Sequence, residues 1–195
     1  MNAQALDDRA KRWAFAAIMI ALVLDVADAT IVNVALPAIE QETGAGATQM
    51  QWIVAGYFLS FGTLLLIGGR LGDIFGYRRL FLTGVGAFTL ASIACGAAPD
   101  ANSLVAARII QGLAGAIMAP QVMAIVQILY SPLERVGRLA WFGLVGGLAA
   151  IIGPVLGGIL IDLNLFDLGW RTIFLINLPV GALAMGLGWR VLPVT

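Results

Sequence analysis

The sequence contains no histidine, one cysteine and few charged residues, and each scarcity excludes a class of function. Without histidine, these 195 residues hold no histidine-based catalytic triad, no histidine-ligated metal site and no histidine proton relay. Cys95 stands alone, so it cannot form a disulfide within the chain, and we expect its thiol to pack inside a helical bundle. The sequence therefore predicts no metal and no cofactor.

The chain is too apolar for a soluble domain. Charged residues make up 11% and hydrophobic residues 61% of the sequence, whereas soluble domains carry about 25% and about 45–50%. Lysine plus arginine equals aspartate plus glutamate, and no basic cluster exceeds three residues, so nothing indicates a nucleic-acid partner. This composition predicts an all-α integral membrane protein whose partner is the lipid bilayer.

Six apolar windows are long enough to cross a bilayer, which takes about 20 residues. They form a transmembrane domain, residues 14–192, behind an N-terminal segment, residues 1–13. The first window is too long for the apolar core of a signal peptide and is expected to be an uncleaved span. The predicted spans are 14–37, 53–69, 80–98, 104–130, 139–161 and 173–192.

Basic residues occur in alternate connections between these spans. The other connections hold Arg171 and mostly acids. Because positive charge stays on the cytoplasmic side, both termini are predicted to be cytoplasmic in a cell (inner or plasma) membrane. Five tryptophans near the span ends predict an interfacial belt. The basic residues are Arg9, Lys11, Arg12, Arg70, Arg78, Arg79, Arg135, Arg138 and Arg190; the tryptophans are Trp13, Trp52, Trp141, Trp170 and Trp189.

The first three spans and the last three are nearly equal in length. Three crossings invert the second triplet relative to the first, which is a transporter architecture. The lead span of each triplet carries buried charge, and this placement predicts a 3+3 inverted repeat.

Asp25 and Asp28 lie in the first span, roughly 60° apart around a helix. They share a face, with Asn33 further outward on its flank. Placing an aspartate in mid-membrane costs about 2.5–3.5 kcal/mol, so we predict a water-accessible site that binds a proton or a cationic substrate. The alternative is a structural carboxylate neutralised by Arg108 or by hydrogen bonds.

The stretch "RIIQGLAGAIMAP" places Arg108, Gln111, Gly112 and Gly115 on one face of the fourth span. Counted along the two helices, Arg108 and Asp28 fall at depths where they can pair. A guanidinium favours the ionised form of a nearby carboxyl group, so Arg108 could regulate proton affinity. The alternative is an arginine that extends to the outer interface.

"GLVGGLAAIIGPVLGG", residues 143–158, spaces small residues at helical intervals, including Gly143 with Gly147 and Gly153 with Gly157. Such pairs let helices pack closely. Pro154 removes one backbone hydrogen bond and allows a bend. The pattern predicts tight packing, and a hinge for rocking is the alternative.

"GRLGDIFGYRR", residues 69–79, joins the second and third spans on the predicted cytoplasmic face. Glycines permit the turn, Asp73 could cap a helix start, and Arg78 and Arg79 could anchor to anionic headgroups. The order of these residues favours a latch between helices over a plain positive loop.

Five segments together resemble the major facilitator superfamily, in the fourteen-helix group of its drug:proton antiporter branch. They are "DATIVNVALP" at 28–37, "GRLGDIFGYRR", "RIIQGLAGA" at 108–116, "GPVLGG" at 153–158 and "WRTIFLINLPVG" at 170–181. The resemblance implies the N-terminal six-helix half of that fold, with the substrate cavity between two halves. We therefore expect either a fragment of a longer antiporter or a chain that pairs with a second chain.

The resemblance also implies roles for individual residues. Asp28 would be the coupling or cation-recognising acid, Arg108 the proton-coupling arginine, and residues of "GPVLGG" the antiporter hinge. Ile74 and Tyr77 replace basic residues of the signature loop, which weakens its charge network. The hinge comprises Gly153, Pro154, Gly157 and Gly158, and the signature loop Gly69, Asp73, Gly76, Arg78 and Arg79.

The expected function is proton-coupled efflux of drugs or small amphipathic compounds, with Asp25, Asp28, Asn33, Arg108 and Gln111 binding protons or substrate. Alternatives are uptake or facilitated transport of a metabolite, and a non-transporting half that acts with a partner chain. An enzyme with an aspartate dyad is disfavoured, because such a dyad takes one aspartate from each of two facing helices.

Overall fold

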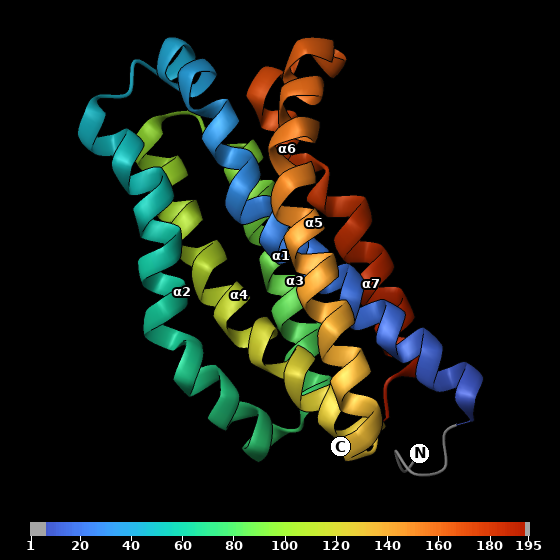
Figure 1. The fold of residues 1–195 in the computed structure, drawn as a ribbon. Helices are drawn as coiled ribbons and strands as arrows, with labels where there is room; N and C mark the ends of the chain where they lie inside the picture. Colours follow the sequence, from blue (N-terminus) through green and yellow to red (C-terminus); the bar gives the residue numbers. More distant parts are fainter. Residues whose placement is uncertain (1–6, 194–195) are drawn as a thin grey trace.

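The computed structural model describes residues 7–193, and this range is all helical, without strands (Figure 1). Six helices are long and apolar enough to cross a membrane, which confirms the fold class. The predicted spans overlap them one for one, and the span limits stay predictions. The helices are α1 (Asp8–Thr43), α2 (Ala47–Phe75), α3 (Tyr77–Gly96), α4 (Ala101–Leu129), α5 (Pro132–Leu163), and a sixth span of η3 (Gly169–Arg171), α6 (Thr172–Leu175) and α7 (Asn177–Val191), preceded by η2 (Leu165–Asp167).

The sixth span is interrupted between α6 and α7, and a proline explains why. Pro179 has no backbone N–H, and its ring clashes with the carbonyl of the residue four positions earlier. That residue is Leu175, where α6 ends. The interruption places Asn177 at the start of α7, facing the interior of the bundle.

Helix α2 meets α3 at a sharp corner made by Gly76, whose φ of 91° suits glycine. Gly76 occupies the N-cap position of α3, and no side chain caps that helix. Asp73 lies in the last turn of α2, where it accepts a 2.5 Å hydrogen bond from the Tyr77 hydroxyl. The prediction that Asp73 caps a helix start is therefore wrong, because the turn falls three residues later.

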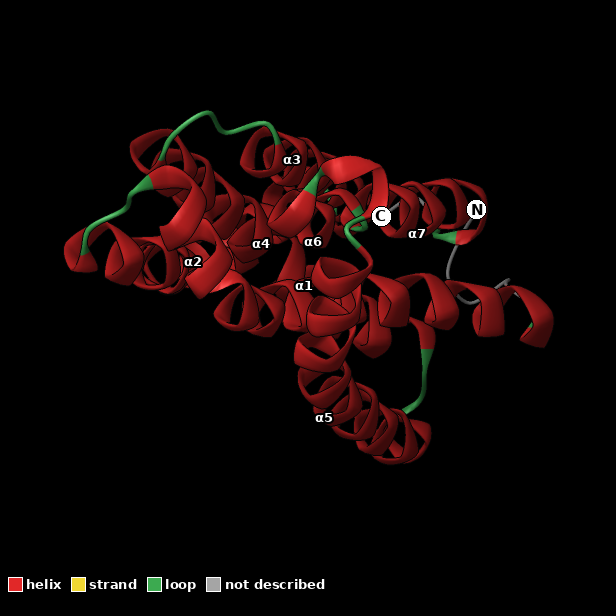
Figure 2. Ribbon diagram, turned by 90° about the horizontal axis from the view of Figure 1, so that it is seen from above, coloured by secondary structure: helices red, strands yellow, loops and turns green. Residues whose placement is uncertain are grey.

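The helices pack in a pattern that repeats between the two triplets (Figures 1 and 2). Helix α1 packs against α5 and α7, just as α4 packs against α2 and α3. In this repeat α1, α2 and α3 correspond to α4, α5 and α7. The contacts of α1 with α5 and α7 therefore correspond to the contacts of α4 with α2 and α3. Because each triplet crosses three times, the second is inverted relative to the first.

Helices α2 and α4 approach each other through glycine. A Cβ added to Gly68 would overlap the Ala116 carbonyl oxygen, and one added to Gly112 would overlap the Tyr57 carbonyl oxygen. Pro120 helps here, because it cannot donate to Ala116 and leaves that carbonyl without its usual helical partner. Backbone contact of this kind takes the place of side-chain interlocking.

We expect Gly112→Ala to lower the free energy of unfolding by about 1–3 kcal/mol, because the added methyl group overpacks this contact. Gly62→Ala, on the same pair of helices, is the matched control, since a Cβ there would meet nothing within 4 Å. Buried Cys95, the sequence's one cysteine, reports unfolding through its reaction with a fluorescent maleimide on heating. Equal melting temperatures for the two variants would contradict this account.

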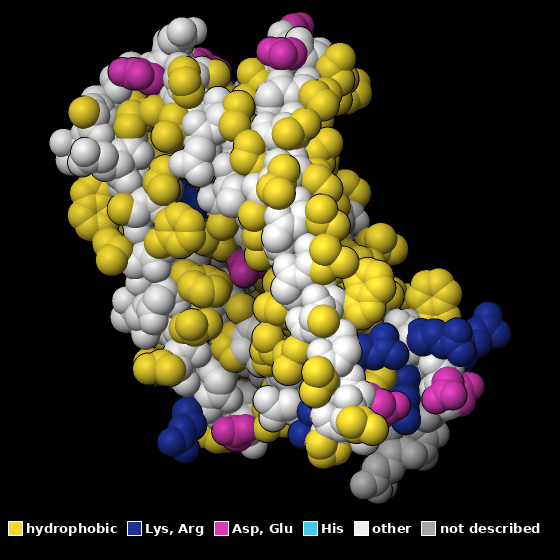
Figure 3. Space-filling model, in the orientation of Figure 1, with side chains coloured by type: hydrophobic (Ala, Val, Ile, Leu, Met, Phe, Trp, Pro, Cys, Tyr) yellow, Lys and Arg dark blue, Asp and Glu magenta, His cyan; other side chains and the backbone are white. Residues whose placement is uncertain are grey.

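Lysine and arginine side chains gather at the end of the bundle where α1 begins and α7 ends (Figures 1 and 3). This end collects the start of α1, α3 and α5 and the end of α2, α4 and α7, which carry most of the basic residues. Arg171 lies at the opposite end, where it forms an ion pair with Glu42. Charge asymmetry between the two ends is therefore a property of the folded bundle.

Trp170 departs from the predicted interfacial belt. Its side chain is 1% exposed, while the other four tryptophans are 45–68% exposed. The indole Nε1 donates to a Glu42 oxygen at 2.8 Å, and the Arg171 guanidinium lies 4.4 Å from the ring centroid. Trp170 thus joins α1 to the connection between α5 and α6, and the prediction that it belongs to the interfacial belt is wrong.

Candidate functional site

Asp28 and Arg108 form an ion pair in the interior of the bundle. Arg108 Nη1 donates to Asp28 Oδ2 at 2.5 Å, and both side chains are fully buried. The prediction that Asp28 and Arg108 lie at depths where they can pair is therefore confirmed. An arginine extending to the outer interface is excluded, because Arg108 has no exposed surface.

Two amides hold the other oxygen of the Asp28 carboxylate. Gln111 Nε2 donates to Oδ1 at 2.9 Å and Asn177 Nδ2 at 2.5 Å. Both amides also donate to the Ser92 hydroxyl oxygen, and that hydroxyl donates to the Phe174 carbonyl. With three donors, both oxygens of the carboxylate are hydrogen-bonded, as a buried charge requires.

Arg108 is held on several sides. Its Nε donates to the Ile53 carbonyl at 3.2 Å, and Nη1 donates to Gln111 Oε1 at 2.6 Å. The guanidinium carbon lies 4.2 Å from the centroid of the Tyr57 ring, a cation–π contact. Among the described residues, Nη2 has no hydrogen-bond partner. Such an unpaired buried donor costs about 1–3 kcal/mol.

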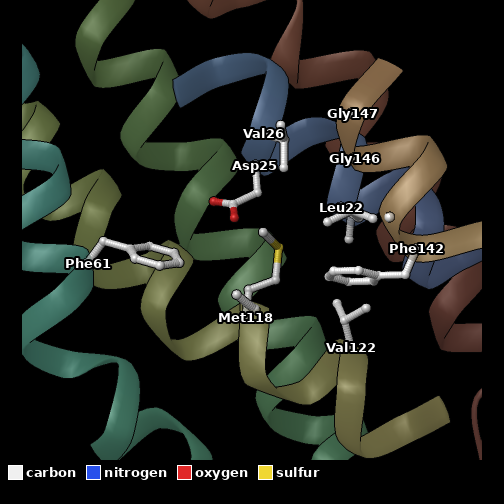
Figure 4. Close-up of a pocket in the computed structure, with 12 residues that line it drawn as sticks. Leu22, Asp25, Val26, Phe61, Met118, Val122, Phe142, Gly146 and Gly147 are labelled. Carbon is white, nitrogen blue, oxygen red and sulfur yellow. The ribbon is translucent and has the colours of Figure 1, made fainter. Parts of the chain in front are cut away.

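Asp25 occupies a different environment one helical turn away. Its Oδ1 accepts a 2.7 Å hydrogen bond from the Tyr57 hydroxyl. Its carboxylate points into a cavity of about 370 Å³ between Phe61 and Met118 (Figure 4). Asp25 also lines an adjoining cavity of about 290 Å³ that reaches Tyr57. Asp25 therefore faces open space, and Asp28 faces protein.

Tyr57 connects the two carboxylates. The hydroxyl group contacts Asp25 while the ring face covers Arg108, which in turn binds Asp28. Gly115 provides room for this arrangement, since a Cβ there would lie 3.0 Å from Asp25 Oδ1. A chain of contacts thus runs from the cavity to the buried ion pair.

The cavity lies among α1, α2, α4 and α5, and its wall is mostly apolar (Figure 4). Gly143 and Gly147 do not act as a packing ridge, because a Cβ at either would meet nothing within 4 Å. They line the cavity instead, since α5 diverges from α1 towards its start. The lining residues are Ala21, Leu22, Asp25, Val26, Phe61, Met118, Ala119, Val122, Phe142, Gly143, Gly146 and Gly147.

The "GPVLGG" segment packs α5 onto α1. A Cβ on Gly153 would lie 2.5 Å from Thr30 Oγ1, and one on Gly157 would lie 2.6 Å from an Ile31 side-chain carbon. Helix α5 continues through Pro154 without a break, and Gly158 lies near Val34. Close packing is therefore present, and the hinge stays a prediction.

The signature loop connects α2 to α3 along the chain and contacts α7 through Arg78. Arg78 donates from Nη2 to the Trp189 carbonyl at 2.5 Å and stacks over the Trp189 ring. Gly69 lies near Pro120 of α4, and Arg79 is exposed. Arg78 therefore contacts a neighbouring helix of the bundle, and the latch stays a prediction.

Sequence reasoning misplaced Asn33 and missed three residues. Asn33 is exposed and donates to the Thr30 carbonyl, because it lies about 140° around α1 from Asp28. Tyr57, Ser92 and Asn177 complete the site and come from α2, α3 and α7. Asn177 could have been found from the sequence, because it is a polar side chain within an apolar span. In the described part of the chain, no group of three potential ligands could hold a metal ion.

Comparison with known proteins places this geometry in a family. Residues 18–195 match the Major Facilitator Superfamily. A probable actinorhodin transporter of Streptomyces coelicolor is 43% identical over 173 residues, which make up 88% of this chain and 30% of that protein. The puromycin resistance protein pur8 of Streptomyces alboniger is 41% identical over 187 residues, or 95% of this chain and 36% of that protein.

Solved structures share the fold at low sequence identity. The inward-open xylose transporter XylE from E. coli has a TM-score of 0.77 at 15% identity, covering 93% of this chain and 48% of XylE. A bacterial homologue of the lysosomal transporter Spinster has a TM-score of 0.76 at 17% identity, covering 95% of this chain and 43% of that one.

The chain spans about a third of the length of the curated relatives named above. Those relatives are named for transport or for resistance to an antibiotic. The family match therefore rejects the hypothesis of a membrane-embedded enzyme in favour of a transporter. From this match, and from an all-helical fold of six apolar spans, we conclude that the chain belongs to the major facilitator superfamily.

Proposed function

We propose that this chain is half of a secondary transporter that exports small amphipathic compounds in exchange for protons. The Asp28–Arg108 pair carries the proposal, because an acid and a base placed in an apolar bundle are expensive and mark proton or substrate pathways. A proton arriving at Asp28 would weaken its attraction to Arg108 and release the arginine. Among the described residues Nη2 of Arg108 has no hydrogen-bond partner, which supports a pair that is not optimised for stability alone.

The second half would come from further chain or from another polypeptide. Helices α2 and α5 present large exposed apolar side chains along their lengths, such as Leu66 and Ile151. Lipid or a second half of the transporter would cover such surfaces. Rocking of the two halves would then supply alternating access, with the hinge at Gly153 and Pro154.

The charged end of the bundle sets the proposed orientation. Basic residues gather where α1 begins and α7 ends, so we place this end on the cytoplasmic side of a cell (inner or plasma) membrane. Arg79 would meet anionic headgroups there. Asp28 and Arg108 would lie towards the outer side, where protons enter.

The test is exchange driven by a pH gradient across inside-out vesicles from cells that produce this chain together with its second half. Ethidium is a suitable probe, because its permanent charge prevents passive trapping by the gradient. With an acidic lumen and a clamped membrane potential, we expect ethidium uptake that nigericin abolishes. Vesicles without the protein are the control. Uptake that ignores the gradient would contradict proton coupling, and uptake equal to the control would contradict export.

A further inference from the structure

The two carboxylates of α1 differ in what their oxygens contact. Asp28 accepts hydrogen bonds from Arg108, Gln111 and Asn177 and is fully buried. Asp25 accepts one hydrogen bond, from the Tyr57 hydroxyl to Oδ1. Within residues 7–193, no donor reaches its Oδ2. Asp25 therefore keeps hydrogen-bonding and charge capacity for a ligand, and Asp28 does not.

The cavity beside Asp25 has the size and composition of a ligand site. Its volume of about 370 Å³ falls within the range of about 300–1,000 Å³ that is typical of small-molecule pockets. Among the described residues that line it, Asp25 is the one ionisable group. Phe61 lies on the side to which the carboxylate points, and the Phe142 ring lines the cavity beyond Met118 (Figure 4).

The sign of the charge selects the ligand. The nearest guanidinium, on Arg108, lies behind the Tyr57 ring and is already paired with Asp28, so it cannot balance Asp25 for an incoming anion. A cation would gain the attraction of Asp25 in a site of low dielectric constant. Aromatic rings add cation–π attraction, which favours cations with little hydration.

We propose that Asp25, held by Tyr57, is the binding group for bulky apolar monocations, and that Asp28 never touches them. This assignment rests on the proposed export function, since it names the substrate class of that transporter's cavity. It also divides the work between the two acids. Asp25 binds the transported cation. Tyr57, which contacts both Asp25 and Arg108, couples this binding to Arg108, the partner of Asp28.

Equilibrium binding to the purified chain in detergent tests this assignment directly. Tetraphenylphosphonium and tetraphenylborate have the same shape and opposite charge, so the comparison isolates the sign of the charge. We expect the cation to bind at least about tenfold more tightly than the anion. Empty micelles at equal detergent concentration correct for partitioning.

Variants then locate the binding group. Asp25→Asn should weaken binding of the cation at least about tenfold and leave the anion nearly unchanged. Tyr57→Phe keeps the ring over Arg108 and removes the hydroxyl, so a smaller loss, about two- to fivefold, is expected. Asp162→Asn, at an exposed acid near the end of α5, is the matched control and should bind as the original chain does. Protection of Cys95 from maleimide shows that each variant is folded.

Two results would overturn the assignment: equal affinity for the two ions, or unchanged binding of the cation by folded Asp25→Asn. The measurement uses one pH and no gradient, so it is independent of transport. Binding of the cation by the purified chain, without proton exchange in vesicles that hold both halves, would refute the proposed function and keep the site. A chain that exchanges protons without this selectivity would refute the site alone.

Discussion

Replacing Arg108 with leucine is expected to lower the free energy of unfolding by about 3–5 kcal/mol, because Asp28 would remain buried without a counter-charge. The present ion pair has no exposed surface on either partner. Two amide donors would still contact Asp28, and neither carries charge. We expect a large fall in the temperature at which Cys95 becomes reactive towards maleimide.

A second variant separates the lost charge from the lost side chain. In the double variant Asp28→Asn with Arg108→Gln, no uncompensated charge is buried, so most of the stability should return. With the single variants Asp28→Asn and Arg108→Gln, it completes a double-mutant cycle that measures the coupling between the two residues. Arg190→Leu, at an exposed arginine of α7, should change stability by no more than about 0.5 kcal/mol. If Arg108→Leu melted like Arg190→Leu, the pair would contribute nothing to the fold.

Asp28→Asn is expected to reduce ethidium exchange driven by a pH gradient to the level of vesicles without the protein. The amide keeps the size of the side chain but can no longer gain or lose the proton on which coupling depends. Insertion into the membrane should persist, because an amide costs less to bury than a carboxylate. The measurement is uptake in inside-out vesicles, corrected for protein content.

The same variant should still bind the cation. Binding of tetraphenylphosphonium by Asp28→Asn is expected to stay within about threefold of the original chain, because Asp28 does not line the cavity. Asp25→Asn should lose both binding and exchange, and Asp162→Asn neither. Full exchange by Asp28→Asn would remove Asp28 from the coupling step.

Sequence patterns predicted the features that depend on distance along the chain. Apolar length located the six spans, and the alternation of arginines located the charged end. Counting the rise along α1 and α4 predicted that Asp28 and Arg108 could pair, which the structure confirms. In each case one helix, with its fixed rise and period, sets the position of the side chain.

Features that depend on a neighbouring helix were predicted less well. Gly143 and Gly153 look alike in sequence, yet one lines a cavity and the other touches α1, because α5 diverges from α1 at one end. Trp170 looks like the other interfacial tryptophans and is buried because Glu42 and Arg171 meet over it. Such differences depend on how neighbouring segments pack against each other, which the pattern of a single helix does not set.

Composition, periodicity and charge order thus determine a six-span membrane bundle with two acids on one face of its first helix. They do not separate the roles of those acids, because Asp25 and Asp28 have the same chemistry and lie one turn apart. The tertiary structure separates them. Helices α4 and α7 bring Arg108, Gln111 and Asn177 to Asp28. For Asp25, the one hydrogen-bond donor among the described residues is Tyr57 of α2, and the rest of that carboxylate faces a cavity.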